Sequence, residues 1–208
     1  MDGKEKVRAS GLEWMRGRIL MRQRRHEEAL WAFGKALELD PRNPAAYRDR
    51  GLVYGRMGQW AKALMDLEEA LKLAPGNREL IALRGMALVQ VGRAEEGVKD
   101  LEEGLRKMRD PNPALLVVLA QGYMELDRFE EALEWVERAL ALDPEAAETR
   151  VLKAAIHLRR GEVEEARKEL RKVVRNKKRE PGWEDIEATL DSLEKTLGPR
   201  PKEEKPKA

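Results

Sequence analysis

Residues 27–43 have the sequence EEALWAFGKALELDPRN, and residues 129–145 have the similar sequence FEEALEWVERALALDPE. Both segments place apolar and small residues at helical spacing, carry charge at most other positions, and then reach an Asp-Pro pair. This pattern is typical of a short amphipathic helix with one buried face. Because proline lacks the backbone N–H that a helix interior needs, we expect these helices to end before Pro41 and Pro144, and another before Pro75.

A fixed period of about 34 residues runs through most of the chain. Pro41 and Pro75 are one period apart, as are Gly17 and Gly51. The other recurring landmarks are Ala29 and Ala63, Phe33 and Leu67, Ala36 and Ala70, then Gly85, Gly97, Leu101 and Gly104, then Ala120, Tyr123, Ala132, Val136 and Ala139, and finally Ala154, Gly161, Ala166 and Leu170. Regular recurrence of this kind indicates a repeat architecture. Since one such unit cannot bury its apolar face alone, we expect neighbouring units to stack.

This pattern resembles the tetratricopeptide repeat family, whose signature combines W-x2-L-G-x2-Y with small residues, an aromatic residue and a closing proline. The two segments quoted above are the strongest matches, and the resemblance extends from about Ser10 to Arg179. It implies an all-α, right-handed α-solenoid of about five helix-turn-helix repeats. The expected repeats are residues 10–43, 44–77, 78–112, 113–146 and 147–180.

The two ends of the chain have patterns of their own. Residues 1–9 form an N-terminal extension, and Ser10 with Glu13 has the spacing of a capping box that would open the first helix. Residues 181–198 have an apolar stripe with acids around it, which predicts a helix that caps the array. The stripe consists of Trp183, Ile186, Leu190, Leu193 and Leu197. The Pro- and Lys-rich residues 199–208 are expected to be disordered.

Glycines fall at two kinds of position in the repeats. Gly58, Gly92 and Gly161 lie between the paired helices of a repeat, where a backbone with positive φ favours glycine. Gly97 and Gly104 replace the usual alanines in the second helix of the third repeat. They indicate either a soft joint, since each glycine costs a helix roughly 1 kcal/mol relative to alanine, or closer packing of two helices.

Composition narrows the classes of function and location. Lys and Arg number 41 against 39 Asp and Glu, so the net charge of +2 gives no global attraction to nucleic acid or an anionic membrane. The charged amino terminus lacks the apolar stretch of a secretory signal, and the longest apolar run, residues 114–120, is far shorter than the roughly 18 residues that span a bilayer. We therefore expect a cytoplasmic protein. Abundant Arg and Glu with few Asn and Gln is also typical of heat-adapted proteins.

The chain has few residues suited to catalysis, and we expect it not to be an enzyme. It has no cysteine, and its two imidazoles are His26 and His157. His26 lacks the second histidine of a zinc-binding H-E-x-x-H helix, while His157 takes the place of a packing aromatic in the family that the chain resembles. No glycine-rich phosphate loop is present. We expect neither a metal ion nor another cofactor.

In the tetratricopeptide repeat family, one face of each first helix lines a concave groove. Carrying those positions over predicts a peptide-binding groove that is basic at its amino-terminal end and apolar in its middle. It consists of Trp14, Arg18, Met21, Arg22, Arg48, Leu52, Arg56, Met86, Val89, Val117, Gln121 and Met124. We expect a scaffold or adaptor that binds a protein segment, whose acidic part meets the arginines and whose apolar part meets the methionines and valines.

Two other functions stay open. A dense basic patch in the last repeat suits a polyanion or an acidic surface, although it lacks the interleaved aromatics that stack on bases, so nucleic acid is the less favoured partner. The patch comprises Arg167, Lys168, Arg171, Lys172, Arg175, Lys177, Lys178 and Arg179, offset within it by Glu169. Open ends of the stack and an outward Trp31 would allow self-assembly into a homo-oligomer.

Overall fold

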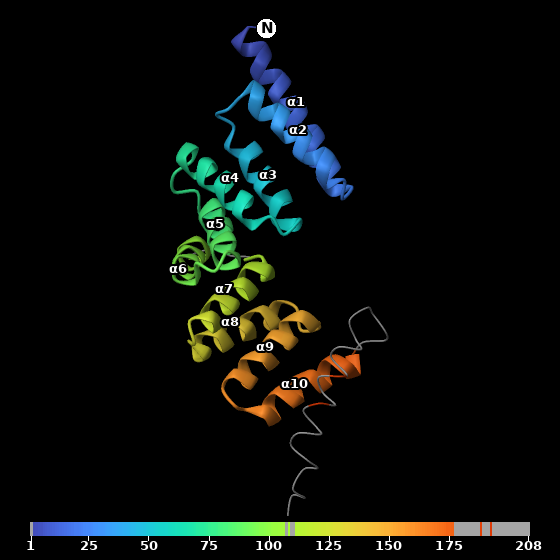
Figure 1. The fold of residues 1–208 in the computed structure, drawn as a ribbon, viewed down its shortest axis with the longest axis vertical. Coiled ribbons are helices and arrows are strands. Elements are labelled where there is room, and N and C mark those ends of the chain that lie inside the picture. Colours follow the sequence, from blue (N-terminus) through green and yellow to red (C-terminus); the bar gives the residue numbers. More distant parts are fainter. Residues whose placement is uncertain (1, 107, 109–110, 177–187, 189–191, 193–208) are drawn as a thin grey trace, which may run out of the picture. The chain divides into compact units, whose positions relative to one another are not determined.

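The structure is a computed structural model that describes residues 2–106, 108, 111–176, 188 and 192. These residues form ten α-helices and no strand (Figure 1). Within this described part, no helix has both the length and the apolarity needed to cross a membrane. Apart from residues 188 and 192, the expected capping helix at 181–198 and tail at 199–208 lie outside the described residues.

The chain divides into two compact units, residues 1–127 and residues 128–208. The boundary separates the two helices of the fourth expected repeat. The first unit contains α1 (Gly3–Arg22), α2 (His26–Leu39), α3 (Pro44–Arg56), α4 (Trp60–Leu73), α5 (Arg78–Gln90), α6 (Ala94–Leu105) and α7 (Pro113–Glu125). The second unit contains α8 (Phe129–Leu142), α9 (Ala147–Arg159) and α10 (Val163–Asn176).

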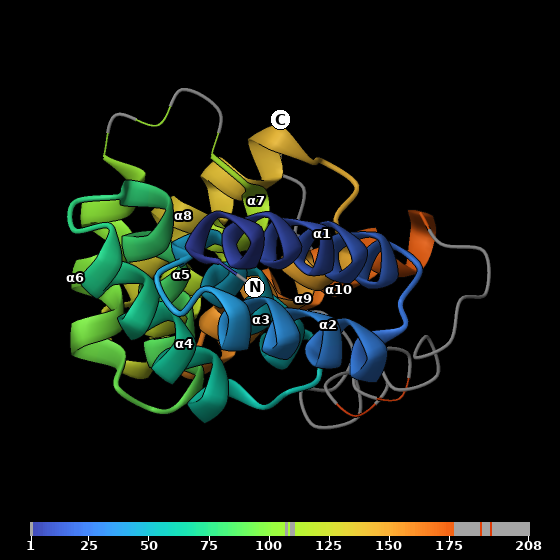
Figure 2. The ribbon, with the colours of Figure 1, turned by 90° about the horizontal axis from the view of Figure 1, so that it is seen from above.

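Helices of the first unit form antiparallel pairs, and each pair packs on the next. α1 packs along α2, α3 along α4, and α5 along α6, while α2 contacts α3, α4 contacts α5 and α6 contacts α7. Figure 2 shows the first pair, α1 and α2, lying side by side. In the second unit, α9 packs against both α8 and α10. The first unit is therefore built from three stacked helical pairs followed by α7, and the second from α8 followed by the pair of α9 and α10.

Local residue choices explain where these helices begin and end. Asn43 and Asn77 accept hydrogen bonds from the backbone N–H groups of the first turns of α3 and α5, which satisfies donors that the helix itself leaves unpaired. The second helices that precede Pro41, Pro75 and Pro144 end before these prolines, as expected. Gly58, Gly92 and Gly161 have φ of +72°, +82° and +77°, which confirms the prediction for the turns within the pairs.

The first helix begins earlier than expected. Asp2 accepts a hydrogen bond from the Glu5 backbone N–H at 2.8 Å, and Glu5 accepts one from the Asp2 N–H at 3.0 Å, so this capping box opens α1. The prediction that Ser10 and Glu13 open it is wrong. Ser10 is 1% exposed and its hydroxyl donates to the carbonyl oxygen of Ala36 at 2.8 Å, so it ties α1 to α2.

In the third pair, α5 and α6 lie in close contact, and glycine makes this possible. A Cβ atom on Gly97 would lie 2.8 Å from the carbonyl oxygen of Gly85, and one on Gly104 would lie 2.6 Å from the Cβ of Ala82. Real Cβ atoms do not approach backbone so closely without a shift of one helix. The geometry therefore supports close packing as the reason for these glycines, rather than a soft joint.

Gly104→Ala is expected to destabilise the protein by about 1–3 kcal/mol, because the added methyl group overpacks the contact between α5 and α6. Gly34 in α2 provides the control, since no neighbouring atom lies within 4 Å of its Cβ position. Gly34→Ala should stabilise by about 0.5–1 kcal/mol, the usual helix preference for alanine. Urea unfolding measures both changes. Stabilisation by Gly104→Ala would contradict the close approach.

Candidate functional site

The candidate groove residues lie on the first helices of successive pairs, and side chains join those helices in order. We call this set the first-helix surface: Trp14, Arg18, Met21, Arg22, Arg48, Leu52, Arg56, Met86, Val117, Gln121 and Met124, on α1, α3, α5 and α7. The joining contacts are Trp14 Nε1 to Asp49 Oδ2 at 2.9 Å, Arg48 Nη1 to Glu79 Oε2 at 3.4 Å, and Gln90 Nε2 to Gln121 Oε1 at 3.3 Å. All of it lies within the first unit.

Asp49 is the centre of the basic end of this surface. It is 2% exposed, accepts hydrogen bonds from the Trp14 indole and the Arg48 guanidinium, and lies 3.7 Å from Nε of Arg18. Burial acts to lower the pKa of Arg48, but the hydrogen bond and charge of Asp49, together with Glu79, raise the pKa above its ordinary value. Arg18 and Arg48 therefore already have a carboxylate partner.

Arg22 and Arg56 differ from the other arginines of this surface. They occupy equivalent positions at the ends of α1 and α3, one repeat apart, and both are exposed. Within the described part of the chain, neither makes an ion pair. Arg22 and Arg56 are therefore the arginines of the first-helix surface that are open to an anionic ligand.

An apolar pocket of about 360 Å³ opens between α3, α4, α5 and α7. Its lining residues include Leu52, Gly55, Arg56, Trp60, Leu83, Met86 and Leu115. The Trp60 ring lies directly on Gly55, since a Cβ atom at Gly55 would be 2.7 Å from Cζ3 of the indole. The carried-over groove positions contain Leu52, Arg56 and Met86 but miss the other four, because these come from second-helix, core and neighbouring-repeat positions.

Val89 is a correction to the candidate groove. Its side chain is 2% exposed, and its Cγ2 atom lies 2.6 Å and 3.1 Å from the Cβ positions of Gly97 and Gly122. It packs where two glycines leave space, so it belongs to the core rather than to an accessible surface. Val117, Gln121 and Met124 are half-buried, as is Met21, which packs against the core residues Leu20 and Phe33.

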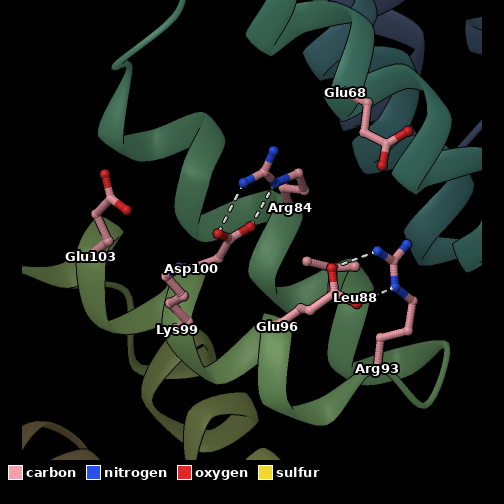
Figure 3. A pocket seen from close by; sticks show the side chains of 8 residues that line it. All are labelled: Glu68, Arg84, Leu88, Arg93, Glu96, Lys99, Asp100 and Glu103. Atoms are coloured by element: carbon pink, nitrogen blue, oxygen red, sulfur yellow. Dashed lines mark hydrogen bonds and ion pairs between the residues drawn. The ribbon is translucent and has the colours of Figure 1, made fainter.

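A second cavity of the first unit, about 300 Å³, is polar (Figure 3). It is lined by Glu68, Arg84, Leu88, Arg93, Glu96, Lys99, Asp100 and Glu103. Both arginines are occupied: Arg84 binds Asp100 through two hydrogen bonds of 2.6 and 2.9 Å, and Arg93 binds Glu96 at 2.8 and 2.6 Å. Internal pairing thus accounts for the charges of these arginines, and the cavity has the character of a solvated ion-pair cluster.

Histidine and carboxylate side chains do not gather into a metal site in the described residues, where no group of three potential ligands occurs. His157 Nδ1 lies 2.7 Å from Glu162 Oε2, a contact between the end of α9 and the following turn. This places His157 in local packing and hydrogen bonding.

The expected basic patch lies on α10 of the second unit, and the structure changes its character. Arg167 is 2% exposed and donates to Glu164 at 2.9 Å, so its inclusion in an accessible patch is wrong. Lys168 and Lys172 pair with Glu165 and Glu169 at 2.6 and 2.7 Å. These acids one turn earlier neutralise much of the stretch. Arg171 and Arg175 lie on α10, while Lys177, Lys178 and Arg179 fall outside the described residues.

The pH dependence of the second unit follows from Glu169. Burial acts to raise the pKa of Glu169, but the hydrogen bond from Lys172 and the charge of Lys153 lower the pKa below its ordinary value. A glutamate with a lowered pKa stabilises the fold above its unfolded pKa, and that stability is lost as the pH falls through the folded pKa. We expect Glu169→Gln to lose less stability than wild type between about pH 6 and about pH 3.

Hydrogen exchange of the α9 and α10 amides, corrected for intrinsic rates, measures this loss. Glu165→Gln is the control, because Glu165 makes a similar lysine pair at an exposed position, where screening by solvent leaves little effect. If wild type and Glu169→Gln lost equal stability on acidification, Glu169 would not be the source of the pH dependence.

Comparison with known proteins places this geometry in a family. Two family models, each described as tetratricopeptide repeat, match residues 17–84 and residues 82–147 and 117–181. Together the matches run from residue 17 to residue 181. Among curated proteins, no sequence matches this chain.

Several solved structures have a similar fold. PilW, described as a widely conserved type IV pilus biogenesis factor, has a TM-score of 0.73 at 18% identity, covering 91% of this chain and 98% of PilW. YrrB, described as a TPR protein with an unusual peptide-binding site, has a TM-score of 0.65 at 21% identity, covering 89% and 91%. MamA (residues 41 to the end) from Desulfovibrio magneticus RS-1 has a TM-score of 0.66 at 16% identity, covering 90% and 96%.

At these identities the likeness concerns the fold. It confirms the expected class, an all-α solenoid of helical repeats. Because the family matches extend over most of the sequence and the helical pairs follow the family's period, the chain belongs to the tetratricopeptide repeat family.

Proposed function

We propose that the protein is a scaffold or adaptor whose first-helix surface binds a segment of another polypeptide. The observation that carries this proposal is a set of accessible side chains on consecutive first helices: the exposed Arg22 and Arg56, which make no ion pair within the described residues, and the half-buried apolar Leu52, Met86 and Met124. The likeness of this chain in fold to YrrB, which is described as having a peptide-binding site, also supports the proposal. The proposal includes no catalytic step and no cofactor, and it places the protein in the cytoplasm on the sequence grounds given above.

The ligand chemistry follows from the two kinds of side chain. Burial of apolar ligand surface against Leu52, Met86 and Met124 stabilises a complex by about 25 cal/mol per Å². Methionine is flexible and adapts to differently shaped apolar groups. An arginine can hold a carboxylate through two hydrogen bonds. Since Arg18 and Arg48 share Asp49, we expect the acidic part of a ligand to meet Arg22 and Arg56 instead.

Affinity capture from the source organism tests this proposal with a matched pair of variants. Arg22→Glu with Met124→Glu alters the first-helix surface, whereas Lys72→Glu with Met65→Glu makes the same kinds of change on α4. We expect the polypeptides retained by wild type to be retained by the α4 variant and lost, by about tenfold or more, from the first-helix variant, since interface hot spots contribute about 2 kcal/mol each. Equal retention by both variants would exclude the first-helix surface.

Self-association is a second candidate, favoured by the exposed stripe Leu12, Met15 and Ile19 on α1, which are 59%, 49% and 57% exposed. The equivalent positions one repeat later are Ala46, Asp49 and Val53 on α3, all buried. Ala46 and Val53 pack against α1 and α2. The stripe thus has the register of a surface that a preceding helical pair covers, and a second copy of this chain can supply helices of that geometry.

Met15→Glu is expected to shift self-association measured by sedimentation toward the monomer, because a charge on the stripe would have to be desolvated. Met65→Glu, an isolated exposed apolar position on α4, should behave as wild type. A wild-type chain that stays monomeric across the concentration range would remove this candidate.

A further inference from the structure

We propose that the apolar pocket between α3, α4, α5 and α7 binds one bulky apolar side chain of the ligand, and that Arg56 binds a carboxylate next to that side chain. The inference rests on the proposed function, which it narrows. It assigns the ligand a defined local chemistry, an aromatic or large aliphatic group with an adjacent acid. In a polypeptide ligand, the carboxylate beside the apolar side chain belongs either to an adjacent Asp or Glu or to the carboxyl terminus.

The size and lining of the pocket fit one side chain. A volume of about 360 Å³ lies at the lower end of the roughly 300–1,000 Å³ that small-ligand pockets occupy, so there is room for a single bulky group. Leu67 and Leu83 form buried parts of the wall, while Leu52 and Met86 are half-buried and remain accessible. Such a lining offers dispersion contacts and loses little hydration when a ligand enters.

Gly55 and Asn112 shape two sides of the pocket. Gly55 allows the Trp60 indole to pack directly on α3, since a Cβ atom there would overlap the ring. On the α7 side, the lining residue Ala114 follows Asn112, which caps that helix by accepting a hydrogen bond from the Ala114 N–H at 3.0 Å. The ring and the capped helix end are both held by local structure. The pocket is therefore a built feature of the fold rather than a gap between long surface side chains.

The charged lining of the pocket determines which ligand group is expected next to the apolar side chain. Among the described residues that line the pocket, Arg56 is the one charged side chain. Other arginines of α3 are occupied, since Arg50 forms two hydrogen bonds with Asp66 and Arg48 binds Asp49. Arg56 is exposed and has no ion-pair partner in the described part of the chain. An exposed guanidinium beside an apolar recess suits a ligand whose carboxylate lies next to its apolar group.

Nuclear magnetic resonance of the full chain tests this with two small probes, N-acetyl-L-phenylalanine, which has a carboxylate, and N-acetyl-L-phenylalaninamide, which lacks one. Both are expected to shift the methyl signals of Leu52 and Met86 and the indole N–H signal of Trp60. The carboxylate should bind wild type about threefold more tightly than the amide, the effect expected of one exposed ion pair.

Variants separate the charge from the pocket. Arg56→Gln should bind both probes equally, whereas Arg42→Gln, at an exposed arginine in the turn before α3 and outside the first-helix surface, should keep the wild-type ratio. Leu52→Trp should fill the pocket and abolish binding of both probes, with an unchanged helical circular dichroism spectrum as the check on folding.

Two results would overturn the inference. If neither probe shifts the Leu52, Met86 and Trp60 signals at high concentration, the pocket does not accept an apolar group. If wild type binds both probes equally, Arg56 has no part in recognition. Either result leaves the proposed function standing when polypeptide capture still depends on Arg22 and Met124, which lie outside the pocket. Loss of that dependence with probe binding intact would instead reject the proposed function.

Discussion

Close approach of paired helix backbones is the constraint on which the rest of this structure depends. Ala29, Ala36 and Ala70 are fully buried, and glycines take over at the tightest contact of α5 with α6. Small residues fill these contacts, and large side chains of the first helices such as Leu80 and Leu119 complete the core. Met86 and Met124 are half-buried on the remaining faces of α5 and α7. The proposed binding surface consists of first-helix side chains that these contacts leave accessible.

Ion pairs repeat with the fold and determine which charges are available. Arg50 with Asp66 and Arg84 with Asp100 are equivalent bidentate pairs in successive repeats, each joining the two helices of one pair. Their hydrogen bonds raise the pKa of both arginines above the ordinary value, although burial opposes this. The first pair has Ala32 in place of the aspartate, and there Arg16 lies over the Trp31 ring at 5.2 Å. Most arginines of α3 and α5 are therefore structural.

The sequence predicts the repeat, the helices and the glycine turns well, because each depends on residues close together in the chain or on one regular period. It predicts the start of α1 wrongly, since Asp2 with Glu5 and Ser10 with Glu13 have the same capping-box spacing and only the packing of Ser10 on α2 distinguishes them. It also gives no signal for Asp127, which adopts a φ of +56° at a turn where the neighbouring repeats have glycine.

The site was predictable only in part, because burial and pairing depend on several helices at once. The repeat register assigns Val89 to the groove, yet its side chain is buried in the space left by glycines on α6 and α7. Trp60 lines the pocket from α4, a second helix that the repeat pattern does not assign to the groove, and Leu115 lines it from a buried position of α7. The sequence of α10 contains many Lys and Arg residues, which predicts a basic patch. In the structure, glutamates one helical turn earlier pair with its lysines.

The most direct measurement is amide hydrogen exchange of the full chain with and without a captured polypeptide. The account predicts added protection along α1, α3, α5 and α7 and at the start of α4, where Trp60 lines the pocket, with α2 and α6 unchanged. Added protection confined to the second helices, or to α10, would contradict it.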